Sequence, residues 1–81
     1  MDSRQVSEVV ERLFRGRTDP YMDKHELMDR AHAMGMPRSL IGYLDALPPG
    51  GQTRERVELH IAEARTTAIG RDVEEALRRA A

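Results

Sequence analysis

His25, Asp29 and His32 are the residues whose types and spacing point most directly to chemistry in this chain. They stand four and three positions apart, so a helix would present all three on one face. Neutral imidazoles and a carboxylate suit zinc or nickel. The stretch "HELMD" only partly matches the zinc-protease helix, because Asp29 stands where that motif has its second histidine. The three residues are therefore a weak candidate metal site, competing with an ordinary solvated helix face, and we expect no cofactor.

Catalytic residues do not form a convincing set. No serine or threonine lies in a nucleophile-elbow context, and the glycine-rich stretch "PPGGQT" lacks the lysine of a phosphate-binding loop. Many carboxylates stand four positions before an arginine, as Glu26 does before Arg30, which is typical of solvated helix faces. We therefore expect a protein that is not an enzyme.

Residues 26–47 have the spacing of a helix-turn-helix corner. Gly35 suits the turn, Ala31 lets two helices approach, and Leu44 falls at a core position of the second helix. The formal net charge of −1 lacks the positive excess that nucleic-acid binders use, so DNA binding is an alternative that the charge disfavours. The side chains offered to DNA would be Arg30, Arg38, Ser39 and Tyr43.

The elements that must position these residues are helices. Apolar residues recur with helical spacing, and glycine and proline separate the segments. The apolar phase runs on through Gly70, so we favour one long C-terminal helix, with a break at Gly70 as the rival. No stretch alternates long enough to predict a strand. The predicted helices cover about residues 3–15, 24–34 and 37–47, and a last helix starts after Thr53 and continues through Leu77.

Three of these helices have a recognisable start. Asp2 with Gln5 and Asp23 with Glu26 have the spacing of capping boxes, in which side chain and backbone bond reciprocally. Thr53 is a good cap for the last helix.

The composition is that of one small domain over residues 1–81. Hydrophobic residues make up 40% of the chain and charged residues 33%, which is typical of a globular protein. Cysteine is absent, and the first residues are acidic without a long apolar run, so we expect a cytoplasmic protein with no membrane segment. The sequence predicts an all-α fold: a small bundle of four helices, a helix-turn-helix-like corner at 26–47 and a long C-terminal helix.

The last helix is the candidate for binding a partner. Ile69, Val73 and Leu77 form an apolar stripe, and short helices need not cover it, so residues 69–81 could project beyond the core. The competing interpretation is that this stripe folds back and completes the bundle. We favour a small protein-interaction or regulatory module that binds a protein partner or forms a homodimer.

The run "ELMDRAHAMGMPRSLIGYLDALP" and the later "TRERVELHI" carry packing and turn residues in a recognisable order. In these features residues 26–61 resemble a small bacterial family known only as a domain of unknown function. The chain departs from that family after the Leu-Pro turn, where Gly51 and Gln52 replace its usual aromatic residue. The resemblance implies a small helical module and implies no catalytic residues. The matching positions are Leu27, Ala31, Gly35, Leu44, Leu47, Pro48, Thr53 and Val57.

Overall fold

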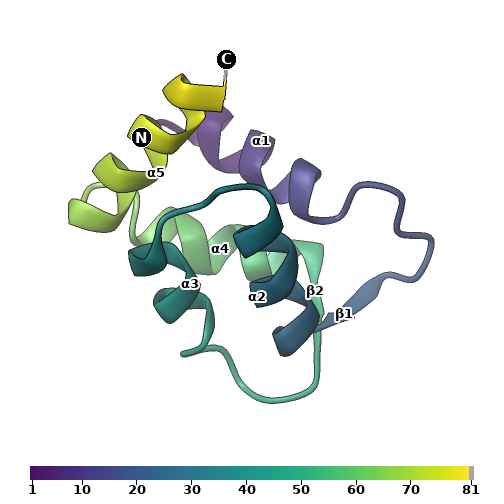
Figure 1. Ribbon diagram of the computed structural model, residues 1–81. Helices are drawn as coiled ribbons and strands as arrows, with labels where there is room; N and C mark the ends of the chain where they lie inside the picture. The colour runs from purple at the N-terminus through teal and green to yellow at the C-terminus, as the bar shows by residue number, and fades with distance from the viewer. Residues whose placement is uncertain (81) are drawn as a thin grey trace.

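The computed structural model describes residues 1–80, which form five helices and two short strands (Figure 1). Helix α1 packs on α4, and α3 packs on both α2 and α5. The mostly helical fold is confirmed, but the pure four-helix bundle is wrong, because the chain adds a fifth helix and a small sheet. The elements in chain order are α1 (Ser3–Leu13), β1 (Tyr21–Asp23), α2 (Lys24–Ala33), α3 (Arg38–Leu44), β2 (Gly51–Thr53), α4 (Arg54–Glu63) and α5 (Ala68–Ala80).

Strands β1 and β2 pair antiparallel, with Met22 opposite Gln52 at the centre. These two side chains are buried, while Tyr21 and Gly51 on either side are exposed. The sequence predicted no strand here, because three residues are too few to show a period of two. The pairing joins two loops that lie far apart in the chain and orders them as one unit.

Each strand ends at the residue that caps the following helix. The Asp23 carboxylate accepts a hydrogen bond from the amide of His25 at 2.8 Å. The Thr53 hydroxyl accepts one from the amide of Arg56 at 3.1 Å, which confirms the predicted cap. In both strand–helix units, the helix therefore buries the residues that stand four and eight positions after its cap. The fully buried residues at these positions are Leu27, Ala31, Val57 and Ile61.

The two predicted capping boxes have different outcomes. At α1, the Asp2 carboxylate accepts from the Gln5 amide at 2.8 Å, and the Gln5 side chain accepts from the Asp2 amide at 2.9 Å. At α2, the Asp23 carboxylate accepts from the amide of His25 and not from that of Glu26, and the Glu26 side chain does not return to the cap, so the cap is confirmed but the capping box is wrong. The Glu26 carboxylate instead meets two guanidinium groups, and charge-assisted bonds outweigh a bond to a neutral amide.

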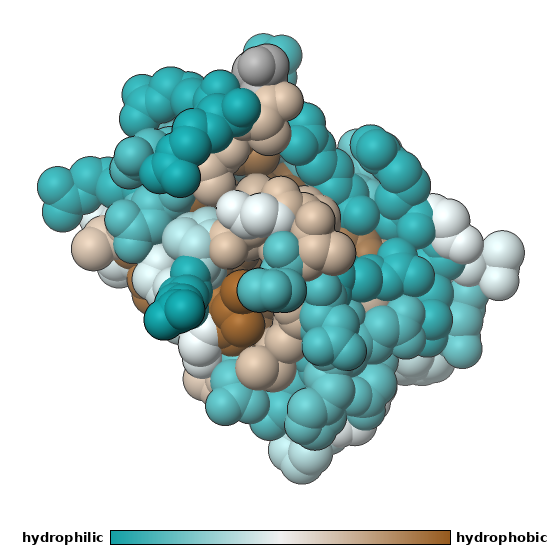
Figure 2. All heavy atoms as spheres, in the orientation of Figure 1, coloured by the Kyte–Doolittle hydropathy of each residue, from teal (hydrophilic) through white to brown (hydrophobic). Residues whose placement is uncertain are grey.

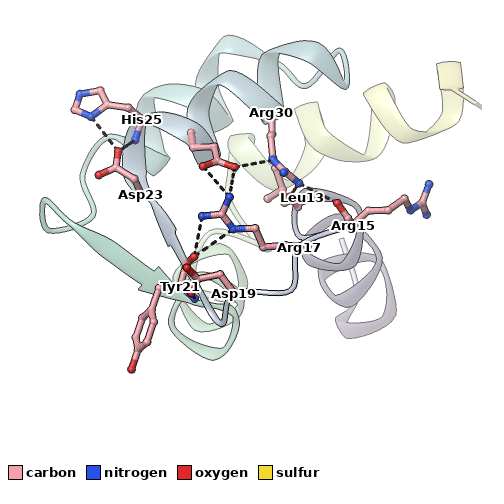
Figure 3. A network of polar contacts seen from close by, with 9 residues as sticks. Leu13, Arg15, Arg17, Asp19, Tyr21, Asp23, His25 and Arg30 are labelled. Atoms are coloured by element: carbon pink, nitrogen blue, oxygen red, sulfur yellow. Dashed lines mark hydrogen bonds and ion pairs between the residues drawn. The ribbon is translucent and has the colours of Figure 1, made fainter.

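A polar network joins α1, the following loop and α2 (Figure 3). Arg17 donates to both carboxylate oxygens of Glu26, at 3.0 and 2.8 Å. Arg30 donates to the carbonyls of Leu13 and Arg15, both at 3.0 Å, and its Nε lies 3.2 Å from Glu26. Leu13 is the last residue of α1 and Arg15 lies in the turn that follows, where carbonyls lack helical partners. Arg30 therefore fixes the end of α1 against α2.

We expect Arg30→Met to lower the free energy of unfolding by about 1–2 kcal/mol, because three acceptors lose a donor while the aliphatic stem remains. The Arg30 side chain is 33% exposed, so water can form some of the hydrogen bonds that the substitution removes. Arg15→Met is the matched control, since that exposed side chain makes no hydrogen bond or ion pair within residues 1–80. Urea denaturation measures both; equal losses in the two variants would contradict the role of Arg30.

The chain turns between α4 and α5 before it reaches Gly70. The favoured single long helix is therefore wrong, and the rival break at Gly70 lies too far along the chain. The Thr67 hydroxyl accepts from the Ile69 amide at 3.2 Å and donates to the Ala64 carbonyl at 2.6 Å. Gly70 is buried in α5, where an added Cβ would lie 2.2 Å from the carbonyl oxygen of Arg65. This glycine serves a close approach within the corner and does not end a helix.

Replacing two helical glycines with alanine should change the free energy of unfolding in opposite directions. We expect Gly70→Ala to lower the free energy of unfolding by about 1–3 kcal/mol, because the corner must open to admit the methyl group. Gly42→Ala in α3 meets nothing within 4 Å and should raise it by about 0.5–1 kcal/mol. Urea denaturation of both variants measures the contrast, and a neutral Gly70→Ala would contradict the tight corner.

The amino terminus is held on α5. The Met1 ammonium lies 2.6 Å from the Glu74 carboxylate and donates to the carbonyl of Arg65 at 3.2 Å. The hydrogen bond from the amino terminus, and then its charge, lower the pKa of Glu74 below its ordinary value of 4.5. The contact ties the start of α1 to the corner that leads into α5.

This contact gives stability a defined dependence on pH. Because the pKa of Glu74 is lower in the folded state, its contribution is complete above the unfolded value of 4.5 and is lost as pH falls through the folded value. We therefore expect Glu74→Gln to lower the urea midpoint at about pH 6 and to match the wild type in strong acid. Glu75→Gln removes a charge that pairs with Arg79 and serves as the control. A Glu74→Gln effect that persists unchanged in acid would contradict the assignment.

Candidate interaction surface

The corner between α2 and α3 is a tight turn. Gly35 takes the left-handed conformation, with φ at +77°, as its place after the helix end predicts. Ala31 and Leu44 are fully buried on the two helices. The second helix is shorter than predicted, with Pro37 at its N-cap position.

The four residues proposed for DNA contact do not form one basic face. The Arg30 guanidinium is engaged by backbone carbonyls and Glu26. The Ser39 hydroxyl donates to Asp72 of α5 at 2.8 Å, and Tyr43 stacks on a histidine of α4. Within residues 1–80, Arg38 is the member of the four that is exposed and makes no hydrogen bond or ion pair. The geometry gives the DNA alternative no added support.

The candidate metal ligands lie on the solvent side of α2. His25, Asp29 and His32 are all exposed, and His25 Nδ1 lies 3.3 Å from the Asp23 carboxylate. Over the part of the chain that the structure describes, no three such side chains come close enough to hold a metal ion.

The apolar stripe of the last helix faces the core. Val73 is fully buried, and the half-buried Ile69 and Leu77 pack against the core cluster. The projecting helix is therefore not what the structure has over residues 69–80, and Ala81 lies outside the described residues. The stripe folds back, as the competing interpretation expected.

Figure 2 shows a small apolar area on one face, over the corner between α2 and α3, surrounded by hydrophilic side chains. On α2, on α3 and in the turn between them, the half-buried Met28, Met34 and Ile41 pack against the core. They offer little free apolar surface to a partner. No helix among residues 1–80 combines the length and the apolar character needed to cross a bilayer.

Leu59 of α4 is the most exposed large apolar side chain among the described residues, at 64%, ahead of Tyr21 at 55%. Val57 and Ile61, two positions before and after it, are fully buried. Since a helix turns about 100° per residue, Leu59 must point away from the core. The signal in the sequence is that Leu59 is out of phase with the buried stripe of α4, although Leu59 was not among the predicted site residues.

Leu59 stands between two surface hollows. We call the surface made of Leu59 and the residues that line both hollows the Leu59 ridge. The first hollow, of about 180 Å³, lies between α4 and the segment after α3. The second is a shallow depression on the other side of Leu59, lined by α4 alone. The first is lined by Ala46, Leu47, Pro48, Arg56, Leu59, His60 and Glu63, and the second by Glu55, Glu58, Leu59 and Ala62.

His60, which lines the first hollow, is held from behind by Tyr43 of α3. The rings of Tyr43 and His60 stack with centroids 4.0 Å apart and planes 12° from parallel. His60 Nε2 lies 2.7 Å from the carbonyl oxygen of Tyr43, which can only accept, so Nε2 carries the proton. Burial, and then the nearby Glu63 carboxylate, raise the pKa of the Tyr43 phenol above 10.0 and keep it neutral. The His60 ring therefore stacks on a neutral phenol.

Two opposite charges flank this hollow along α4. Arg56 and Glu63 are both exposed, and neither forms an ion pair or a side-chain hydrogen bond within residues 1–80. The neighbouring Glu58, by contrast, accepts from the Ser7 hydroxyl of α1 at 3.3 Å. The charges beside Leu59 are therefore available to a partner.

Comparison with protein-family models, curated proteins and solved structures gave no match to this chain. The resemblance of residues 26–61 to a bacterial domain family stays a prediction. The function is accordingly inferred from the geometry of the surface itself.

Proposed function

We propose that this chain is a small, non-catalytic helical module that binds another protein chain through the Leu59 ridge. The observation that carries the proposal is the 64% exposure of Leu59 between two hollows, on a helix whose opposite face is fully buried. Rigid helices that present an apolar side chain beside a pocket are a common form of protein recognition. The cytoplasm remains the compartment that we expect for this interaction.

The ridge replaces the last helix as the proposed binding element. Val73 lies in the core, so the stripe on α5 has no free apolar face to offer. Burying a leucine side chain completely is worth roughly 1.5–3 kcal/mol, and most of that gain is still available at Leu59. The flanking charges would add orientation more than affinity.

Site-specific photo-crosslinking tests this function. A benzoylphenylalanine replaces Leu59 in one variant and the exposed Tyr21 in the control, and both are irradiated in cells of the native host. We expect a discrete protein adduct from position 59 only, because the ridge is the surface that contacts a partner. Mass spectrometry identifies the adduct as a second copy or another protein. No adduct from position 59, or the same adducts from both positions, would contradict the proposed function.

A further inference from the structure

Four side chains on the outer side of α4 form a single helical stripe. Arg56, Leu59, His60 and Glu63 follow one another at steps of three, one and three, so they share one face. All four line the same hollow. The stripe begins with a positive charge, has an apolar and aromatic centre and ends with a negative charge.

This order makes the stripe complementary to itself in one orientation. If two copies of α4 lie antiparallel about a two-fold axis between Leu59 and His60, then Arg56 of each copy faces Glu63 of the other. Leu59 of each copy faces His60 of the other. A parallel arrangement would instead place Arg56 on Arg56 and Glu63 on Glu63, which is repulsive.

In this orientation, Leu59 of the second copy lies over the first hollow. The first hollow, of about 180 Å³, is open to solvent, so a leucine side chain of the second copy can enter it beside His60 and the segment Leu47–Pro48. The stacking of His60 on Tyr43 fixes the His60 ring, so it need not be ordered on binding.

We propose that the partner of the Leu59 ridge is a second copy of this chain, bound antiparallel about that two-fold axis. This inference rests on the proposed function, since it names the partner for the same surface. Two short helices and their flanking segments make a small interface, which belongs to the weak and reversible class. The dimer therefore forms as the concentration rises.

Charge reversal on the full chain tests the orientation. Sedimentation equilibrium from about 10 μM to about 1 mM covers the range expected for such an interface. We expect wild type to dimerise, and Arg56→Glu and Glu63→Arg each to raise the dissociation constant at least about tenfold, since both ion pairs become repulsive. The double variant R56E/E63R exchanges the charges and restores both pairs, so it should dimerise like wild type.

Mixing the two single variants gives a sharper readout. The Arg56→Glu chain is acidic at both ends of the stripe, and the Glu63→Arg chain is basic at both ends. In an equimolar mixture these two chains should form heterodimers where neither variant dimerises alone. Arg38→Glu and Glu11→Arg reverse exposed charges on other helices and should leave the dissociation constant unchanged. Circular dichroism confirms that every variant is folded.

Specific results overturn the proposal. A wild-type chain that stays monomeric up to about 1 mM, or a double variant and a mixture that fail to recover dimers, would show that α4 does not pair with itself in this way. If position 59 still yields an adduct with a different protein, the proposed function stands and only the identity of the partner is wrong. If position 59 also yields no adduct, the proposed function and the antiparallel dimer are both wrong.

Discussion

The pairing of β1 with β2 is the constraint on which the rest of the molecule depends. Met22 and Gln52 meet at the centre of the sheet, and both are buried. Each strand passes directly into the cap of a helix, so the pairing fixes where α2 and α4 begin and which of their faces is buried. The side chain of Gln52 extends this control, because its Nε2 donates to the carbonyls of Pro48 and Gly50 at 2.6 and 3.2 Å. The segment that walls the first hollow is thereby tied to the sheet.

The exposure of Leu59 follows from this constraint. Turning α4 to bury Leu59 would bring Val57 and Ile61 into water, and each fully buried aliphatic side chain contributes roughly 1.5–3 kcal/mol. Two such losses exceed the gain from one leucine, so the helix keeps its phase. The Thr53 cap and the packing of α1 on α4 act in the same direction. The ridge is thus held in place before any partner arrives.

The parts of the fold that could be predicted from the sequence are those set by neighbouring residues. The reciprocal bonds of Asp2 with Gln5, the Thr53 cap and the turn at Gly35 each depend on a few adjacent positions, and all three are present. Glu26 was misread because Arg17, nine residues earlier, reaches it only in the folded chain. The sheet was missed because strands of three residues pair across the fold and leave no local pattern.

Local patterns also failed to predict the corner between α4 and α5 and the hollow beside Leu59. The apolar phase runs across residues 64–67, so periodicity did not reveal the turn that the Thr67 hydroxyl stabilises. Leu59 was visible as a residue out of phase. The hollow beside Leu59 could not be predicted from the sequence, because it is formed with the segment after α3, whose position depends on the sheet.

An isotope-filtered nuclear Overhauser experiment on a mixture of labelled and unlabelled chains tests the central claim most directly. The sample is held at a concentration where the protein associates, and only contacts between copies are recorded. We expect cross-peaks between the Leu59 methyl groups of one copy and the His60 ring of the other. Contacts between copies that arise instead from Ile69 and Leu77 of α5, or no contacts at all, would contradict the central claim.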